Sequence, residues 1–317
     1  MTSNAIEMIR SRLGLGRGLP VDEVFTPMSP VRGSLMFVGR LRERDQFHSA
    51  MRQPGVQILV YGDSTSGKTS LVNRECSAHG RVFRRLACPR VREGDSVFPL
   101  LRDTLSPRAH HEDRNTVERR SKSAINGSLG VVRGAMDTEE RVESTRTLRA
   151  RTLGSTSTNI SEMVLRRNLL LFVDDLERVA SDEDLLCLGD LAKQVSDGSF
   201  RSAGKCVFAY ACSDLADVPK PLRGATNRIR PIYLPRMARG EIRELVLQGM
   251  ALSQLRLTPE VIEAVVSLAD GQPSVAHAIC LSLADEVLRQ SGRIDRTLHA
   301  GDPCVDSSWF SRAVARD

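Results

Sequence analysis

Up to Pro235, short apolar runs alternate with longer amphipathic segments along the chain. The runs have the length and β-branched character of buried strands, whereas the amphipathic segments repeat their apolar residues at helical spacing. The predicted strands are Val56–Tyr61, Arg81–Ala87, Asn168–Asp174 and Cys206–Cys212, and the predicted helices are Leu41–Arg52, Thr69–Ser77, Val97–Leu105, Ile160–Arg167 and Leu185–Val195. This alternation predicts an α/β fold with a parallel, doubly wound sheet.

After Pro235 the apolar residues recur at helical spacing throughout. This pattern predicts three amphipathic helices, Ala238–Leu252, Pro259–Ala269 and Ser274–Arg289. We interpret them as a small C-terminal helical lid. The predicted divisions are an N-terminal segment (1–34), an α/β domain (35–235), the lid (236–290) and a tail (291–317). Within the first of these, Ala5–Leu13 suits a short helix and Gly14–Arg32, with its prolines and glycines, is typical of a linker.

Residues 106–157 are polar, charged and poor in large apolar groups, which indicates an insertion outside the main core. Inside it, Ala124–Met136 alternates apolar residues with glycine and suits a β-hairpin. His110 and His111 also fall in the insertion, and we expect both at the surface.

Composition narrows the class of protein. The chain has 317 residues, with 41% hydrophobic and 26% charged residues, as globular proteins do. Its seven cysteines include no C-x-x-C pair, which favours free thiols in a reducing compartment over disulfides or a zinc site. We see neither a signal peptide nor a run long enough to span a bilayer, so we expect a cytoplasmic protein without a membrane contact. A net charge of +6 permits nucleic-acid binding without requiring it.

The octapeptide Gly62-Asp63-Ser64-Thr65-Ser66-Gly67-Lys68-Thr69 follows the first predicted strand and opens a predicted helix that continues with Ser70. It matches the phosphate-loop pattern G-x-x-x-x-G-K-[ST]; a glycine- and serine-rich surface turn is the alternative. The glycines let successive N–H groups turn inward, where they and the positive end of the helix attract phosphate oxygens. Lys68 would neutralise the β- and γ-phosphates of ATP, and the Thr69 hydroxyl would be a ligand of Mg²⁺.

Polar residues also follow the next two buried strands. We expect Asp174 to hold Mg²⁺ through water together with Thr69, and Asp175 to orient the attacking water, because carboxyl ends of parallel strands share one edge of a sheet. The alternative is that this acidic pair only caps the next helical turn. Ser213 or Asp214 is our candidate for sensing the γ-phosphate, and a turn or capping role is the alternative.

Phe37-Val38-Gly39-Arg40 with Glu43, the phosphate loop, Asp174-Asp175 and Gly271-Gln272-Pro273 occur in an order that resembles the AAA+ and STAND ATPases, among them origin-recognition, NACHT and NB-ARC proteins. The resemblance covers about residues 36 to 290. It implies that Val38 and Gly39 lie beside the adenine and that Pro273 contacts the nucleotide. Ser274 stands where many AAA+ lids carry a sensor arginine, which favours the STAND side.

Seven basic residues lie between Lys220 and Arg243, with Glu241 as the nearby acid in sequence. Three interpretations stay open. Arg228 or Arg230 could be an arginine finger for the ATP of a neighbouring subunit. The stretch could contact DNA or RNA phosphates. It could also be an ordinary solvated charged face.

Three functional hypotheses follow from the resemblance and the motifs. The first is a STAND-type signalling or defence switch that hydrolyses ATP slowly, self-associates and engages a protein partner, which would supply the domains that the chain has no room for. The second is a DNA-associated AAA+ regulator of replication, partition or transposition. The third is a nucleotide-binding scaffold without turnover.

Overall fold

The computed structural model describes residues 18–31, 36–90, 96–105, 156–199, 202–223, 228–292, 296–299 and 301–308. Within them, five parallel strands form one sheet in the order β2-β3-β4-β1-β5. Their bounds are β1 Gln57–Gly62, β2 Phe83–Ala87, β3 Leu170–Asp174, β4 Lys205–Ala211 and β5 Ile229–Tyr233. The predicted α/β class and the four predicted strands are confirmed. The fifth strand, β5, buries only Ile229 and Ile232 and lacks a continuous apolar run.

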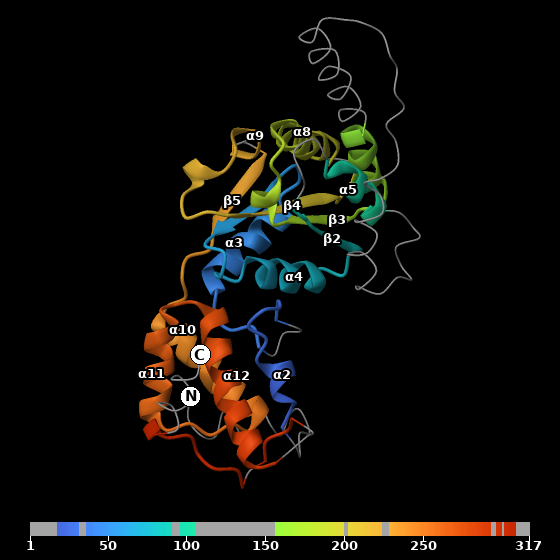
Figure 1. Ribbon diagram of the computed structural model, residues 1–317. Helices are drawn as coiled ribbons and strands as arrows, with labels where there is room; N and C mark the ends of the chain where they lie inside the picture. Colours follow the sequence, from blue (N-terminus) through green and yellow to red (C-terminus); the bar gives the residue numbers. More distant parts are fainter. Residues whose placement is uncertain are drawn as a thin grey trace, which may run out of the picture.

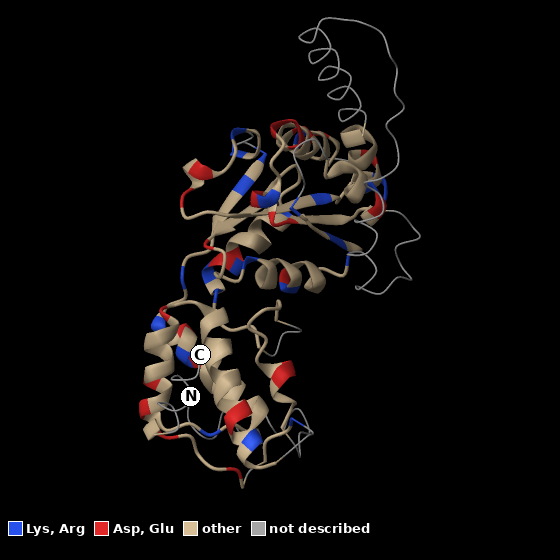
Figure 2. Ribbon diagram, viewed as in Figure 1, with Lys and Arg blue, Asp and Glu red and all other residues tan. Residues whose placement is uncertain are grey.

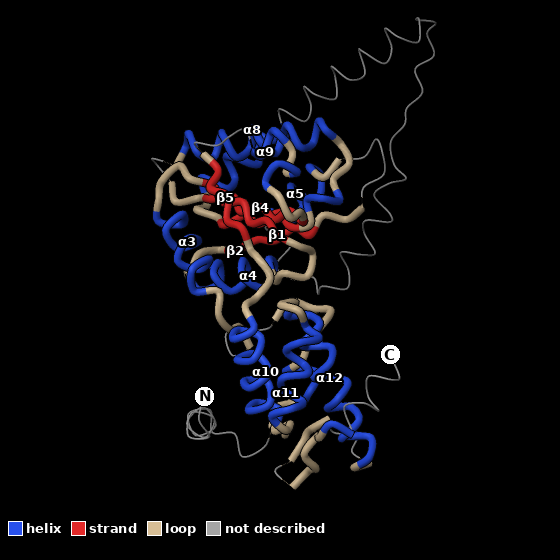
Figure 3. The backbone as a smooth tube through the Cα atoms, turned by 90° about the vertical axis from the view of Figure 1, so that its left-hand side faces the viewer, coloured by secondary structure: helices blue, strands red, loops and turns tan. Residues whose placement is uncertain are grey.

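Helices cover both faces of the sheet. Helices α3 (Leu41–Arg52) and α4 (Lys68–Ala78) lie on one face, and α5 (Phe98–Leu105), α8 (Asp182–Gly198) and α9 (Lys220–Arg223) lie on the other (Figure 1 and Figure 3). A helix at residues 156–166 contributes to the same core as α5 and α8. Short 3₁₀ turns, η3 (Leu176–Arg178) and η4 (Leu215–Asp217), follow β3 and β4.

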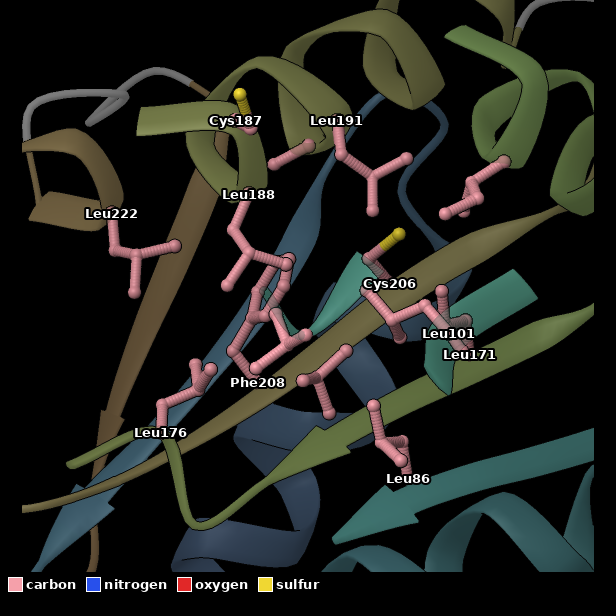
Figure 4. Packing of buried hydrophobic residues seen from close by; sticks show 14 of the residues in the cluster. Leu86, Leu101, Leu171, Leu176, Cys187, Leu188, Leu191, Cys206, Phe208 and Leu222 are labelled. Atoms are coloured by element: carbon pink, nitrogen blue, oxygen red, sulfur yellow. The ribbon is translucent and has the colours of Figure 1, made fainter. Parts of the chain in front are cut away.

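The central strands are buried on both sides, which explains their apolar runs. In β3, Leu171 and Val173 join the core under α8, whereas Leu170 and Phe172 join the core under α3 and α4. Successive strand residues point to opposite faces, so a strand covered on both faces is apolar at every position. Figure 4 shows Leu188 of α8 packed toward the β4 residue Phe208 in the first of these cores.

The lid is a bundle at one end of the α/β domain, on the side of α3 and α4 (Figure 1). Its helices are α10 (Arg239–Ser253), α11 (Pro259–Ala269) and α12 (Pro273–Gln290), close to the three predicted segments. They share an apolar core that is separate from the two cores of the sheet. Proline at the first helical position begins both α11 and α12, where its missing N–H is not needed.

We predicted a linker over Gly14–Arg32, and this prediction is wrong for the part of the segment that the structure describes. Residues 21–24 form a short helix, α2 (Val21–Val24), which packs against α10 and α12 (Figure 1). Val21, Val24 and Phe25 are buried in the core of the lid. Three apolar residues that complete a small bundle outweigh the local bias of the prolines. The predicted helix Ala5–Leu13 lies outside the described residues.

The tail prediction for 291–317 is likewise wrong for the residues that are described. Leu298 and Val305 have no exposed surface and belong to the core of the lid. Val305 also forms a parallel bridge with Leu257, between α10 and α11. A few apolar residues within a polar, glycine-rich stretch were enough to hold it against the bundle.

The insertion falls almost wholly outside the described residues, and with it the predicted hairpin Ala124–Met136 and the two histidines His110 and His111. Its last two residues belong to the core instead, because residues 156–166 are helical and Ser157 has no exposed surface. Over the described ranges, no helix combines the length and apolar character that crossing a membrane requires.

Candidate nucleotide-binding site

The phosphate loop connects β1 directly to α4, as predicted, and its two glycines are required by its geometry. Gly67 has a φ of 93° at the N-cap of α4, a left-handed conformation that suits glycine. A side chain at Gly62 would collide with the carbonyl oxygen of Leu234, the residue after β5. The loop is therefore seated against the junction that leads to the lid.

The ammonium group of Lys68 lies inside the loop. Its Nζ donates to the carbonyl oxygens of Gly62, at 3.0 Å, and Asp63, at 2.8 Å. Burial lowers the pKa of Lys68, while Glu177 and Asp174 oppose the shift. The Ser66 hydroxyl oxygen is buried without a hydrogen-bond partner among the described residues. A cation and an unpaired hydroxyl in one tight loop fit a phosphate group.

Thr69 and Asp174, the two residues that would hold a metal ion, are in contact. The Thr69 Oγ1 donates to Asp174 Oδ2 over 2.8 Å, although β4 separates β1 from β3 in the sheet. A hydroxyl and a carboxylate are oxygen ligands of the kind that Mg²⁺ takes, usually with water and substrate phosphates. No cluster of three or more His, Cys, Asp or Glu side chains in the described ranges offers a metal site made of protein alone.

Arg85 of β2 also binds Asp174, and the sequence analysis missed it. Its Nη2 and Nε lie 2.7 Å and 3.1 Å from Asp174 Oδ2, and the backbone N–H of Asp175 donates to Oδ1 over 3.0 Å. Asp174 is only 1% exposed, so these donors compensate the burial of its charge. Because β2 and β3 pair in register, Ala87 opposite Asp174, a basic residue near the end of β2 is the signal that could have found it.

Asp175 and Glu177 line the cleft beside the loop. Asp175 has a φ of 58°, and burial, followed by the charge of Asp174, raises the pKa of its carboxyl group. Arg178 partly offsets this shift from 3.6 Å away. The Glu177 carboxylate accepts from the backbone N–H of Ala211 over 3.0 Å and so ties η3 to the end of β4. Asp175 therefore lies in the cleft next to Asp174, and its role in orienting water stays a prediction.

Ser213 and Asp214 are exposed and do not line the cleft. The Asp214 carboxylate accepts from the backbone N–H of Ala216 and caps η4. The structure therefore has the capping arrangement that we had kept as the alternative. Neither residue lines the cleft that holds the phosphate loop, so no contact of theirs within the described residues supports a role in sensing the γ-phosphate.

The rest of the cleft lies between the loop, the N-terminal segment and the lid. Its lining includes Val38, Pro273 and every residue from Ser64 to Ser70, whereas Gly62, Asp63 and Gly39 are not part of it. The roles predicted for Val38 and Pro273 on the nucleotide stay predictions. Gly39 serves a different purpose: a side chain there would collide with the Glu241 carboxylate of the lid.

Several polar contacts join the loop to the lid. The Thr65 hydroxyl donates to Gln272 Oε1 over 2.8 Å. Arg236 lies 3.6 Å from the Asp63 carboxylate and also pairs with Asp270. A Cβ built on Gly67 would lie 3.9 Å from Pro273. The residues that would surround a triphosphate are thus in direct contact with the first turn of α12 and the residues before it.

Arg40 and Glu241 form a second connection. Arg40 is 5% exposed, and its Nη2 donates to the carbonyl oxygen of Ser66 over 2.9 Å. Its backbone N–H donates to Glu241 Oε1 over 2.7 Å, while Glu241 Oε2 accepts from Ala238 at the start of α10. One carboxylate therefore caps α10 and holds the segment that supports the loop.

Comparison with known proteins identifies the family. The family Novel STAND NTPase 1 (nSTAND1) matches residues 31–291, which include the loop, the Asp174 strand and the lid. The chain belongs to this family. It is a P-loop NTPase of the STAND and AAA+ kind. No curated protein matches the chain.

Solved structures share the fold of this nSTAND1 protein. The Aeropyrum pernix Orc1 protein, in complex with DNA, is 12% identical at a TM-score of 0.55; the match covers 94% of this chain and 69% of that one. A point mutant of Thermotoga maritima RuvB is 11% identical at a TM-score of 0.51, covering 88% and 70%. RuvB of the same organism, named as a Holliday junction branch migration motor, is 13% identical at 0.50, covering 89% and 73%. At such low sequence identity, these likenesses show a shared fold and nothing about a shared function.

The basic stretch of this nSTAND1 protein is mostly paired with acids from other elements. Arg228 binds Asp197 at 2.8 Å, and Arg239 and Arg243 bind Glu263. Figure 2 shows basic and acidic positions interspersed over both the α/β domain and the lid. These pairs favour a charged face over a phosphate-binding surface.

The arginine-finger candidates lie away from the cleft of their own chain. Arg228 precedes β5, and its carbonyl accepts from Gln57 at the start of β1, the edge of the sheet opposite the phosphate loop. Arg230 contacts Gln53 at the same edge. A role for Arg228 on the nucleotide of a neighbouring copy stays a prediction.

Replacing Glu241 by alanine should lower the free energy of unfolding by about 2 kcal/mol, because two backbone N–H groups lose a charged acceptor. Urea denaturation followed by circular dichroism measures the change. Glu244→Ala, an exposed position one turn along α10, is the matched control and should change stability little. Equal midpoints for the two variants would contradict the role assigned to Glu241.

Proposed function

We propose that this nSTAND1 protein is an ATP-binding and slowly ATP-hydrolysing switch, in which the nucleotide sets the position of the lid. The observation that carries the proposal is the direct contact between the phosphate loop and the lid, through Thr65 with Gln272 and through Arg236 with Asp63 and Asp270. A ligand that rearranges the loop changes these contacts as well, and so has different affinity for different lid positions.

The loop would bind the triphosphate with its N–H groups and with Lys68, whose ammonium would exchange loop carbonyls for phosphate oxygens. Thr69 and Asp174 would hold Mg²⁺, which when bound neutralises charge on the phosphates. Asp175 would orient the attacking water, since it lines the cleft beside Asp174. Loss of the γ-phosphate would then release the lid.

The proposed switch would self-associate and bind a protein partner or effector, as in the STAND-type signalling or defence switches of our first hypothesis. We place the switch in the cytoplasm, in keeping with seven cysteines, all within the described ranges, that form no disulfide. The DNA-associated alternative draws on the Orc1 and RuvB likenesses, which concern fold. The acid pairing of Arg228, Arg239 and Arg243 favours the protein-partner hypothesis.

The test compares the full chain with Mg²⁺ and either ADP, a non-hydrolysable ATP analogue or no nucleotide. Hydrogen exchange should slow around residues 36–41 and 271–275 with the ATP analogue, and light scattering should show a larger assembly than with ADP. Phosphate release should be slow but should require Mg²⁺. Identical exchange and mass in all three states would refute the switch. Assembly that requires duplex DNA and weakens steeply with salt would select the DNA-associated alternative.

A further inference from the structure

The part of the cleft beyond the phosphate loop has apolar walls. Met36 and Val38 come from one side, and Met237, Leu245 and Pro273 come from the lid. Walls of this kind, with a few polar groups between them, suit the flat ring of a nucleobase. The residues between these walls should then determine which base the site accepts.

Besides the Ser66 hydroxyl oxygen of the phosphate loop, two polar atoms of the cleft residues are buried and lack a hydrogen-bond partner among the described residues. They are Thr26 Oγ1, from the N-terminal segment, and His277 Nε2, from α12. Thr26 lies next to the buried Phe25, whose ring meets the imidazole of His277 edge to face. Buried polar atoms in folded proteins are nearly always paired, so two unpaired atoms beside one cleft point to a ligand.

The contacts of His277 define which groups it can offer. The Thr26 backbone N–H donates to His277 Nδ1 over 3.2 Å, so in the neutral ring the proton is on Nε2. Burial lowers the pKa of His277 to about 4, which keeps the ring neutral at physiological pH. Nε2 is therefore a hydrogen-bond donor, whereas the Thr26 hydroxyl can accept as well as donate.

We propose that Thr26 and His277 recognise the adenine ring, with His277 Nε2–H donating to the ring nitrogen N1 and Thr26 Oγ1 accepting from the 6-amino group. Adenine presents an amino group beside an unprotonated ring nitrogen, which matches this donor and acceptor. Guanine has a carbonyl oxygen in place of the amino group and a protonated N1 beside it. The inference rests on the proposed function, because it assigns the base specificity of the same nucleotide site.

The position of Thr26 follows from the fold. The backbone of Thr26 is bonded to the lid through His277, and Val31 N donates to the Ser70 hydroxyl at the start of α4, over 3.2 Å. The segment between these two bonds therefore spans the cleft from the lid to the phosphate-loop helix. A segment held at both ends keeps Thr26 in place beside the cleft, and a fixed side chain is well suited to select a ligand.

Titration calorimetry on the full chain with Mg²⁺ tests the assignment. The ligands are ATP, GTP, purine riboside triphosphate, which lacks the 6-amino group, and inorganic tripolyphosphate, which reports on the phosphate loop alone. The variants are Thr26→Val, which keeps the shape of the side chain, and His277→Leu. Thr104→Val, in α5 and outside the cleft, is the matched control.

The unmodified protein should bind ATP roughly tenfold or more tighter than GTP. Thr26→Val should weaken ATP roughly tenfold while leaving purine riboside triphosphate nearly unchanged, and His277→Leu should weaken both. Tripolyphosphate should bind all variants equally. Equal affinities for ATP and GTP, or equal losses of ATP and purine riboside triphosphate in Thr26→Val, would overturn the inference while leaving the phosphate site intact. A protein that binds neither ATP nor tripolyphosphate would overturn the proposed function, and this inference with it.

Discussion

Lys68→Ala should weaken binding of ATP by roughly thirtyfold or more, since removing one member of a buried charged contact costs about 2–5 kcal/mol and each 1.4 kcal/mol is tenfold in affinity. Lys68 is only 7% exposed, and its ammonium group donates to two loop carbonyls. The carboxylates of Glu177, Asp174 and Asp175 are the negative charges that act on this ammonium group. A triphosphate that enters the loop without Lys68 meets those carboxylates unscreened.

Calorimetric titration with a non-hydrolysable ATP analogue measures the effect, and thermal melting checks that the variant folds. Lys193→Ala is the matched control, because Lys193 is an exposed lysine on α8, across the sheet from the loop. Unchanged affinity in folded Lys68→Ala would place the nucleotide elsewhere in the molecule.

The loop, the Asp174 strand and the lid helices could be predicted because each is determined by neighbours in sequence. A buried parallel strand is apolar at every position, and the phosphate loop must combine fixed glycines, one lysine and one hydroxyl within eight residues. Asp174 is the last residue of its strand. In the folded sheet Thr69 and Asp174 are in contact. The sequence had suggested this, because β1 and β3 are parallel and their carboxyl ends lie at the same edge of the sheet.

The residues that were missed depend on contacts between segments far apart in the chain. Arg85 reaches Asp174 only because β2 pairs with β3, and Glu241 meets the Gly39–Arg40 peptide only because the lid folds back. Thr26 was assigned to a linker, since its prolines were weighed and the three apolar residues before it were not. The local composition of a segment indicates which backbone conformations it prefers. Where the N-terminal segment lies is decided instead by the burial of its apolar residues against helices far away in the sequence.

Asp175→Asn should leave ATP affinity within about threefold but slow hydrolysis by roughly 10²- to 10⁴-fold, the usual contribution of a group that positions and accepts a proton. The amide keeps the size of the side chain and its place beside Asp174, so Thr69, Asp174 and the loop should be undisturbed. It cannot accept a proton from the attacking water. The charge lost is one that burial and Asp174 already disfavour, which is why binding should not suffer.

Phosphate release under single-turnover conditions, with affinity measured in parallel, separates the two effects. Asp190→Asn, at an exposed position on α8, is the matched control and should hydrolyse ATP normally. A variant that loses affinity and rate together would make Asp175 a binding residue, and one that keeps full rate would move the water-orienting role to Glu177, the other acid that lines the cleft. Either outcome would leave the phosphate loop in place. Only retained binding with lost turnover fits a switch held closed by its own nucleotide.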